Sequence, residues 1–228
     1  MTSLVCGGCG FNPPQQIPAH CLLCGTPKDR FVSEAYVNER CPLKETRVNH
    51  RVTRLKAEAL GVSVYRITTP HRSVLIDCLP TFNPDLPVID AILFTHRDFM
   101  GASDRYHQHW GSEVYLHEAE HQHPLACHHH VSHAFSGDFQ YHEIEAFVLG
   151  GHTPGFTVYI YRDVLFVCDL VVGHAEDMRF NPFGHREKIR LGAQRLKHLL
   201  RRRTVRTVCG FNYVTDFDQW MPYFKKLS

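Results

Sequence analysis

Residues 151–155 read Gly151-His152-Thr153-Pro154-Gly155, a short turn that presents one histidine directly after an apolar stretch at residues 144–149. Glycine and proline on either side of the histidine are typical of a tight loop, because glycine tolerates left-handed backbone angles and proline ends regular elements. Imidazole is also the commonest metal ligand among side chains. This stretch therefore predicts a metal-binding loop at the end of a β-strand.

Two more apolar runs, residues 91–94 and 164–168, are each followed by candidate metal ligands. If the strands that they predict share one edge of a sheet, four side chains converge there: His96, Asp98, His152 and Asp169. Two imidazoles and two carboxylates suit zinc or non-haem iron.

These motifs resemble those of the metallo-β-lactamase superfamily. Its members carry Thr-His-x-His-x-Asp-His after one strand, Gly-His-Thr-Pro-Gly after another, an aspartate ending a later strand, and a last histidine near the C-terminus. The resemblance covers roughly residues 45–228, and residues 151–155 match at every position. It implies an α+β fold, the αββα sandwich of the metallo-β-lactamases, in which two sheets lie between helices.

The chain departs from that pattern at the ligands of the second metal. Met100 stands in place of the aspartate, Gly101 in place of the third histidine and Phe211 in place of the last histidine. Asp98 takes the place of the second histidine. The remaining set is His96, Asp98, His152 and Asp169. It predicts a single zinc or iron ion, with an empty site as the alternative, and it disfavours two-metal hydrolysis.

The N-terminus carries two Cys-x-x-Cys-Gly knuckles, Cys6 with Cys9 and Cys21 with Cys24. Each knuckle offers two thiolates to one ion, and four thiolates form a closed tetrahedral site that suits zinc or a single iron. With its proline-rich loop and its Thr26-Pro27-Lys28 exit, the segment resembles the rubredoxin-like domain of rubrerythrins. We therefore expect residues 1–31 to form a rubredoxin-like metal-binding module. The plainer alternative is a structural zinc ribbon.

Composition limits the possible partners and setting. A chain of 228 residues with 43% hydrophobic content can bury a sizeable core, and a net charge of +2 gives no reason to expect nucleic acid as a partner. No run approaches the ~20 apolar residues of a membrane span. We see no basic start followed by an apolar stretch, so no secretory signal is expected. Four of the nine cysteines are accounted for by the knuckles, which favours a reducing, cytoplasmic setting.

The rest of the chain alternates between strands and helices, with residues 45–228 predicted as one metallo-β-lactamase-like domain. Further strands are expected at residues 62–68, 73–77, 113–116, 144–149, 157–161 and 205–208. Helices are expected at residues 102–110, 186–203 and 216–226, and residues 47–60 show weak helical periodicity. The basic residues of the helix at 186–203 are interpreted as a solvated face.

Residues 117–142 contain eight histidines. Their irregular spacing favours solvated polar residues over a metal store. His117 ends a predicted strand and could contact the site.

Two classes of function follow from these motifs. The first is an enzyme that acts on a small-molecule substrate: a single-metal hydrolase of the metallo-β-lactamase type, or an oxidoreductase with a redox partner if iron occupies both sites. No catalytic residue can be assigned from the sequence. The second is a non-catalytic binding or regulatory protein that keeps the fold together with a structural zinc ribbon.

Overall fold

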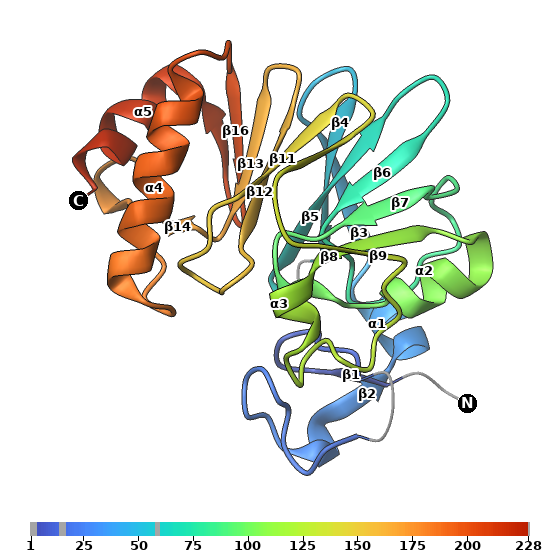
Figure 1. The fold of residues 1–228 in the computed structure, drawn as a ribbon. Coiled ribbons are helices and arrows are strands. Elements are labelled where there is room, and N and C mark those ends of the chain that lie inside the picture. Colours follow the sequence, from blue (N-terminus) through green and yellow to red (C-terminus); the bar gives the residue numbers. More distant parts are fainter. Residues whose placement is uncertain (1–3, 14–16, 58–59, 228) are drawn as a thin grey trace. The chain divides into compact units, whose positions relative to one another are not determined.

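The computed structural model describes residues 4–13, 17–57 and 60–227, which form two compact units (Figure 1). The first unit comprises Met1–Leu116 and His121–Ala134, and the second comprises His117–Glu120 and Phe135–Ser228. No helix among the described residues has the length and apolar character needed to cross a membrane.

The first unit is built on a seven-stranded sheet whose strands lie in chain order. They are β3 (Leu43–Arg47), β4 (Val52–Ala57), β5 (Val62–Thr68), β6 (Ser73–Ile76), β7 (Ala91–Leu93), β8 (Glu113–His117) and β9 (His133–Phe135). Pairing is antiparallel from β3 to β6 and parallel from β6 to β8. Every residue of β6 and β7 is buried, so these two strands form the centre of the core.

Helix α2 (Ser103–Trp110) packs on this core through Tyr106, which is fully buried. The 3-10 turn η3 (Arg97–Phe99) connects β7 to that helix, and it carries one of the expected metal motifs. The short helix α3 (Glu118–His121) follows β8.

The weak helical periodicity at residues 47–60 is the prediction that the structure contradicts. Residues 43–47 and 52–57 are strands, because β4 pairs along its whole length with β5 and nearly so with β3. Val52 and Leu55 are both buried, and their three-residue spacing imitates a helical face. Pairing on both sides of β4 decides its conformation.

The N-terminal residues also belong to the first unit. Strand β1 (Leu4–Cys6) pairs with β2 (Phe31–Ser33), followed by helix α1 (Glu34–Arg40), and the turn η1 (Lys28–Arg30) precedes β2. Cys6, Phe11 and Cys21 form a small apolar cluster with Leu125 from the histidine-rich stretch. The domain boundaries expected at residues 1–31 and 45–228 remain a prediction.

The second unit is built on a six-stranded sheet in the order β10-β11-β12-β13-β16-β17. These strands are β10 (Phe139–Tyr141), β11 (Ile144–Val148), β12 (Thr157–Tyr161), β13 (Val164–Cys168), β16 (Thr207–Gly210) and β17 (Val214–Asp216). Only β13 and β16 pair in parallel. A two-stranded ribbon of β14 (Val171–Val172) and β15 (Arg179–Phe180), with the turn η4 (Ala175–Asp177) between them, follows β13.

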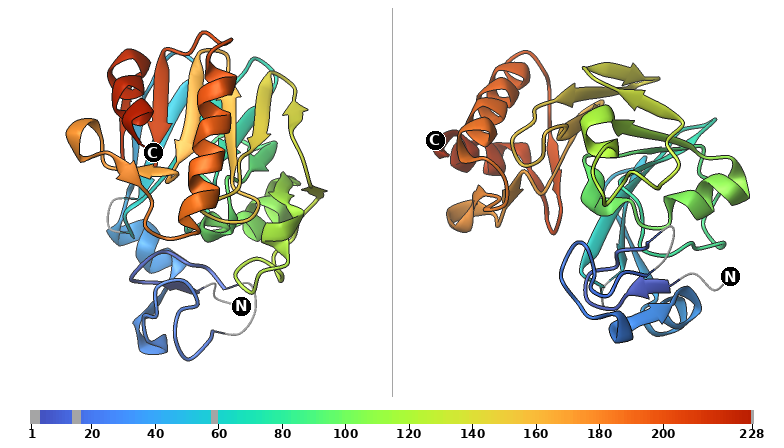
Figure 2. Two further views of the ribbon diagram at one scale, coloured as in Figure 1. Left: turned by 60° about the vertical axis from the view of Figure 1, so that its left-hand side comes forward. Right: turned by 60° about the horizontal axis from the view of Figure 1, so that its bottom comes forward.

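Helices α4 (Arg186–Leu200) and α5 (Phe217–Lys226) lie on one face of this sheet, as the further views in Figure 2 also show. Helix α4 buries a stripe of small and apolar residues at helical spacing, which is typical of a helix that packs on a sheet. The stripe is Ile189, Gly192, Ala193, Leu196 and Leu200. The predicted helices at 102–110, 186–203 and 216–226 are confirmed to within a few residues.

Candidate metal centres

The four N-terminal cysteines bring their sulfur atoms together in the first unit. Cys6 and Cys24 lie 3.6 Å apart, as do Cys9 and Cys21, and all four sulfur atoms lie within 4.8 Å of one another. A disulfide would need about 2.05 Å. Two thiolates on one tetrahedral ion, each at about 2.3 Å from it, lie about 3.8 Å apart. The spacing of the four sulfur atoms therefore fits a tetrahedral zinc or iron ion.

Hydrogen bonds lower the pKa of one of these four thiols, which favours its thiolate form. Partial burial raises the pKa of the Cys24 thiol, but hydrogen bonds from Thr26, Cys9 and Cys6 together outweigh burial and lower the pKa to about 6. The Thr26 hydroxyl lies 3.0 Å from the Cys24 sulfur. At Cys9 and Cys21, burial raises the pKa. A bound cation favours the thiolate form, so binding an ion here releases protons.

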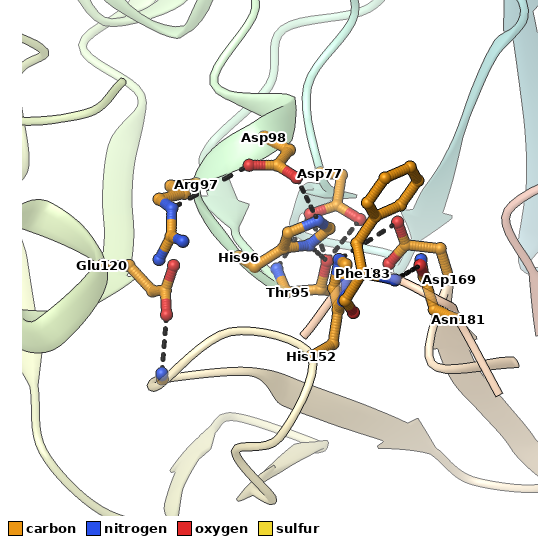
Figure 3. Close-up of polar contacts among 11 residues, drawn as sticks. Asp77, Thr95, His96, Arg97, Asp98, Glu120, His152, Asp169, Asn181 and Phe183 are labelled. Atoms are coloured by element: carbon orange, nitrogen blue, oxygen red, sulfur yellow. Dashed lines mark hydrogen bonds and ion pairs between the residues drawn. The ribbon is translucent and has the colours of Figure 1, made fainter. Parts of the chain in front are cut away.

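The first unit holds a histidine and a carboxylate close together in the loop after β7 (Figure 3). His96 Nε2 lies 3.4 Å from Asp98 Oδ2. Two ligands that bind one tetrahedral zinc through nitrogen and oxygen, each at about 2.0–2.1 Å, lie about 3.3 Å apart. The His96 side chain is fully buried, whereas that of Asp98 is 23% exposed. This pair has the spacing of two ligands of one ion.

A hydrogen-bond chain fixes the tautomer of His96. The Thr95 hydroxyl donates to the Asp77 carboxylate at 2.9 Å and lies 2.9 Å from His96 Nδ1. Since that hydroxyl proton is used on Asp77, the hydroxyl oxygen accepts from Nδ1–H, and Nε2 keeps its lone pair in the neutral ring. Asp77 is 3% exposed and has a left-handed backbone (φ 62°), an unusual conformation that its bonds to Thr95 support.

The second unit holds a similar pair, with the histidine in the loop after β11 and the carboxylate directly after β13. His152 Nδ1 donates to the backbone oxygen of Phe183 at 2.7 Å, because a carbonyl oxygen only accepts. In a neutral ring the Nε2 atom of His152 then carries the lone pair, and it lies 3.5 Å from Asp169 Oδ2. Such outer hydrogen bonds are what normally orients a metal-binding histidine. Both pairs therefore present an Nε2 atom beside a carboxylate.

Comparison with known proteins supports the fold of about four fifths of the chain. A metallo-β-lactamase from Pontibacter korlensis aligns with a TM-score of 0.62 at 18% sequence identity, covering 81% of this chain and 98% of that one. One from Hirschia baltica aligns with a TM-score of 0.64 at 13% identity, covering 81% and 97%. FIM-1 from Pseudomonas aeruginosa, solved in a mono-zinc form, aligns with a TM-score of 0.62 at 13% identity, covering 81% and 94%. The chain has the metallo-β-lactamase fold.

Comparisons of the sequence found no related protein, in contrast to the comparison of structures. No protein-family model matches this sequence, and a search of the curated proteins found no match. The resemblance that residues 151–155 indicated is confirmed at the level of the fold, and the α+β class is confirmed with it.

Packing leaves no room for a metal-binding side chain at two positions that the resemblance assigns to a second metal. The Met100 side chain is 1% exposed and belongs to the apolar core of the first unit. Gly101 has a left-handed backbone (φ 49°), and a Cβ at this position would overlap the carbonyl group of Leu79, whose carbon would lie 2.8 Å away. Because no side chain fits at Gly101, the third histidine of the pattern has no room here.

The Gly-His-Thr-Pro-Gly loop of the metallo-β-lactamase fold is held by residues that the motif itself does not contain. The backbone N–H of Gly155 donates to Glu120 Oε1 at 2.6 Å, and Glu120 is fully buried. The His117 ring packs directly on Gly155, and a Cβ there would lie 2.5 Å from His117 Nδ1. His117 thus has a packing role against this loop. The sequence carried no signal for Glu120.

The close approach of His117 gives a stability prediction for Gly155→Ala. Adding a methyl group forces the His117 ring or the loop to move, and overpacking of this kind costs about 1–3 kcal/mol. We expect a lower denaturation midpoint in chemical unfolding. Gly137→Ala is the matched control, because a Cβ at Gly137 meets nothing within 4 Å. Equal midpoints for the two variants would contradict the role assigned to His117.

The irregular spacing of the histidines at residues 117–142 predicts a solvated segment, and this prediction is only partly correct. His129 is 4% exposed and its Nδ1 atom lies 2.8 Å from Asp104 Oδ2 at the start of α2. Burial alone would raise the pKa of the Asp104 carboxyl, but the hydrogen bonds and charges of His129 and His130 together outweigh burial, and the pKa is lowered. His130 stacks on His107 with ring centroids 3.7 Å apart. At least His129 therefore has a structural role in the first unit.

Proposed function

We propose that this protein binds one ion at the four cysteines and a single ion at a site made of His96, Asp98, His152 and Asp169. The site of His96, Asp98, His152 and Asp169 is proposed because both units contain a histidine–aspartate pair with the same geometry. In both pairs an imidazole Nε2 lies 3.4–3.5 Å from a carboxylate oxygen, and the other ring nitrogen is held by a hydrogen bond. Two histidines and two carboxylates match the donors that zinc and non-haem iron prefer.

We propose a single ion because the two positions assigned to a second metal cannot supply a ligand. Met100 lies in the core and Gly101 has no room for a side chain. FIM-1 was solved in a mono-zinc form, so one protein of this fold holds a single zinc ion. Asp98 adds a negative charge where the metallo-β-lactamase pattern has a neutral histidine, which lowers the net positive charge of the site.

The activity that fits this site best is single-metal hydrolysis of a small molecule. A divalent ion with an open coordination position supplies an activated water and polarises a carbonyl or phosphoryl oxygen. The chain's own residues position that chemistry: Thr95 and the Phe183 carbonyl hold the two imidazoles, and Glu120 holds the loop that carries His152. If iron occupies both sites, the four-cysteine centre suits a redox activity with an electron-transfer partner instead.

The alternative is a non-catalytic binding or regulatory protein. In that case the four-cysteine site is a structural zinc ribbon and the second site holds no ion. None of the nine cysteines, all of which lie in the described residues, forms a disulfide, which fits a reducing, cytoplasmic setting under both alternatives.

Elemental analysis of the purified wild-type protein tests the assignment. We expect two ions per chain, and the colour separates the metals, because iron bound by four thiolates is red when oxidised and zinc is colourless. A single ion, released by thiol-specific reagents, would contradict the second site and favour the non-catalytic alternative. Anomalous scattering from two ions about 3.5–4 Å apart, the usual spacing of two-metal sites, would contradict the single-ion assignment.

A further inference from the structure

The helical side of the second unit contains a cavity of about 440 Å³. Its walls come from the segment between β15 and the first turn of α4, and from the C-terminal end of α5. This volume lies within the range of about 300–1,000 Å³ that small-molecule sites occupy. None of the four proposed metal ligands lines it.

The lining of this cavity is strongly cationic. Arg179, Arg186 and Lys226 all contribute to it, and no aspartate or glutamate is among the described residues that line it. Arg179 is oriented by a hydrogen bond from its guanidinium to the backbone oxygen of Asp177 at 3.2 Å. Lys226 lies over the ring of Tyr223, with its ammonium nitrogen 5.1 Å from the ring centroid. Three cations without a carboxylate in the same lining favour an anionic occupant.

The start of α4 adds to this positive charge. Arg186 is the first residue of this fifteen-residue helix, and no side chain caps its N-terminus. The first N–H groups of such a helix carry partial positive charge and bind phosphate and similar anions. Glu187, the acidic residue of the first turn, is not among the residues that line the cavity.

The walls of the cavity are fixed by hydrogen bonds on both sides. Lys197 of α4 donates to the backbone oxygens of Leu227 at 2.7 Å and Lys225 at 3.2 Å, which ties the end of α5 to α4. On the other wall, Asn181 accepts from the Phe183 N–H at 3.0 Å, and the His185 N–H donates to Gly151. The backbones that carry the three cations are therefore held in place before any ligand binds.

We propose that this cationic pocket, defined by Arg179, Arg186 and Lys226, binds a phosphate group of a small molecule. A phosphate monoester carries close to two negative charges at neutral pH, which three cations and a helix N-terminus can match. Arginine is suited to this role, because its planar guanidinium donates two parallel hydrogen bonds to phosphate oxygens. The remaining volume leaves room for an organic part beyond the phosphate.

Titration of the full-length, metal-loaded protein with inorganic phosphate and phenyl phosphate, followed by calorimetry, tests the proposal. Arg186→Ala and Lys226→Ala are each expected to weaken binding by about tenfold or more, the effect of losing a hydrogen bond to a charged group. Lys188→Ala and Lys225→Ala are the matched controls, since both side chains are exposed and neither lines the pocket. The controls should change the affinity less than about twofold, within the usual range for a surface charge.

The outcomes separate this pocket from the proposed metal site. His96→Ala, which removes a proposed metal ligand of the first unit, should leave phosphate binding intact, whereas loss of binding in that variant alone would place the phosphate on the metal and overturn the proposal. Failure of the wild-type protein to bind phosphate, or equal weakening in all four lysine and arginine variants, would also overturn it. Acetate binding as tightly as phosphate would contradict the preference for a dianion. Far-ultraviolet circular dichroism of each variant checks that the fold is kept.

Discussion

Cys9→Ser is expected to release the ion from the four-cysteine site and to loosen the N-terminal part of the first unit. Serine supplies no thiolate at neutral pH, so the ion loses one of four ligands in a closed site. Metal binding and folding are coupled in such small modules, where zinc contributes about 10–16 kcal/mol of apparent binding free energy in zinc-finger peptides. Elemental analysis should show one ion fewer per chain than in the wild type.

The loosening should extend beyond the cysteine loops. Leu125 is distant in sequence but packs in one apolar cluster with Cys6, Phe11 and Cys21. Hydrogen exchange in Cys9→Ser should therefore lose protection both in the described N-terminal residues and around Leu125, while β12 and β13 of the second unit keep theirs. Cys127→Ser is the control, because Cys127 is exposed and lies outside the cluster. Unchanged metal content in Cys9→Ser would refute the four-cysteine site.

His152→Ala is expected to abolish binding of the second ion while leaving the four-cysteine ion in place. The substitution removes the Nε2 donor, which lies 3.5 Å from Asp169 Oδ2. Loss of an outer-shell partner alone typically costs about 10–100-fold in metal affinity, so losing a direct ligand should exceed that range. Equilibrium dialysis against zinc measures the change. Any hydrolytic activity found for the wild type should disappear with the ion.

Two further variants make this result specific. Thr95→Val keeps His96 but removes the hydroxyl that holds Nδ1, so an intermediate loss of about 10–100-fold is expected. Phe183→Ala should have little effect, because His152 bonds to the backbone oxygen of Phe183 and the side chain is 76% exposed. A His152→Ala protein that still binds two ions would show that the assignment of His152 is wrong.

Much of the fold could be predicted because its signals are local. The strands at residues 62–68, 157–161 and 164–168 have the bounds that the sequence predicts. Their apolar residues are neighbours in the sequence, so the signal for a buried strand lies within the strand. The strand β4 was missed for the opposite reason. Its conformation depends on pairing with β3 and β5, and the spacing of its buried residues carries no trace of those partners.

The sequence by itself determined which side chains are candidate ligands: the two cysteine knuckles, the histidine of the Gly-His-Thr-Pro-Gly loop, and the residues that follow two other strands. These motifs can be recognised in the sequence because their residues lie within a few positions of one another. Only the tertiary structure decided how those ligands are presented. The tautomer of His96 depends on Asp77, and that of His152 on the Phe183 carbonyl. The cationic pocket joins Arg186 to Lys226. These residues are far apart in sequence, and only folding of the chain brings them to the same site.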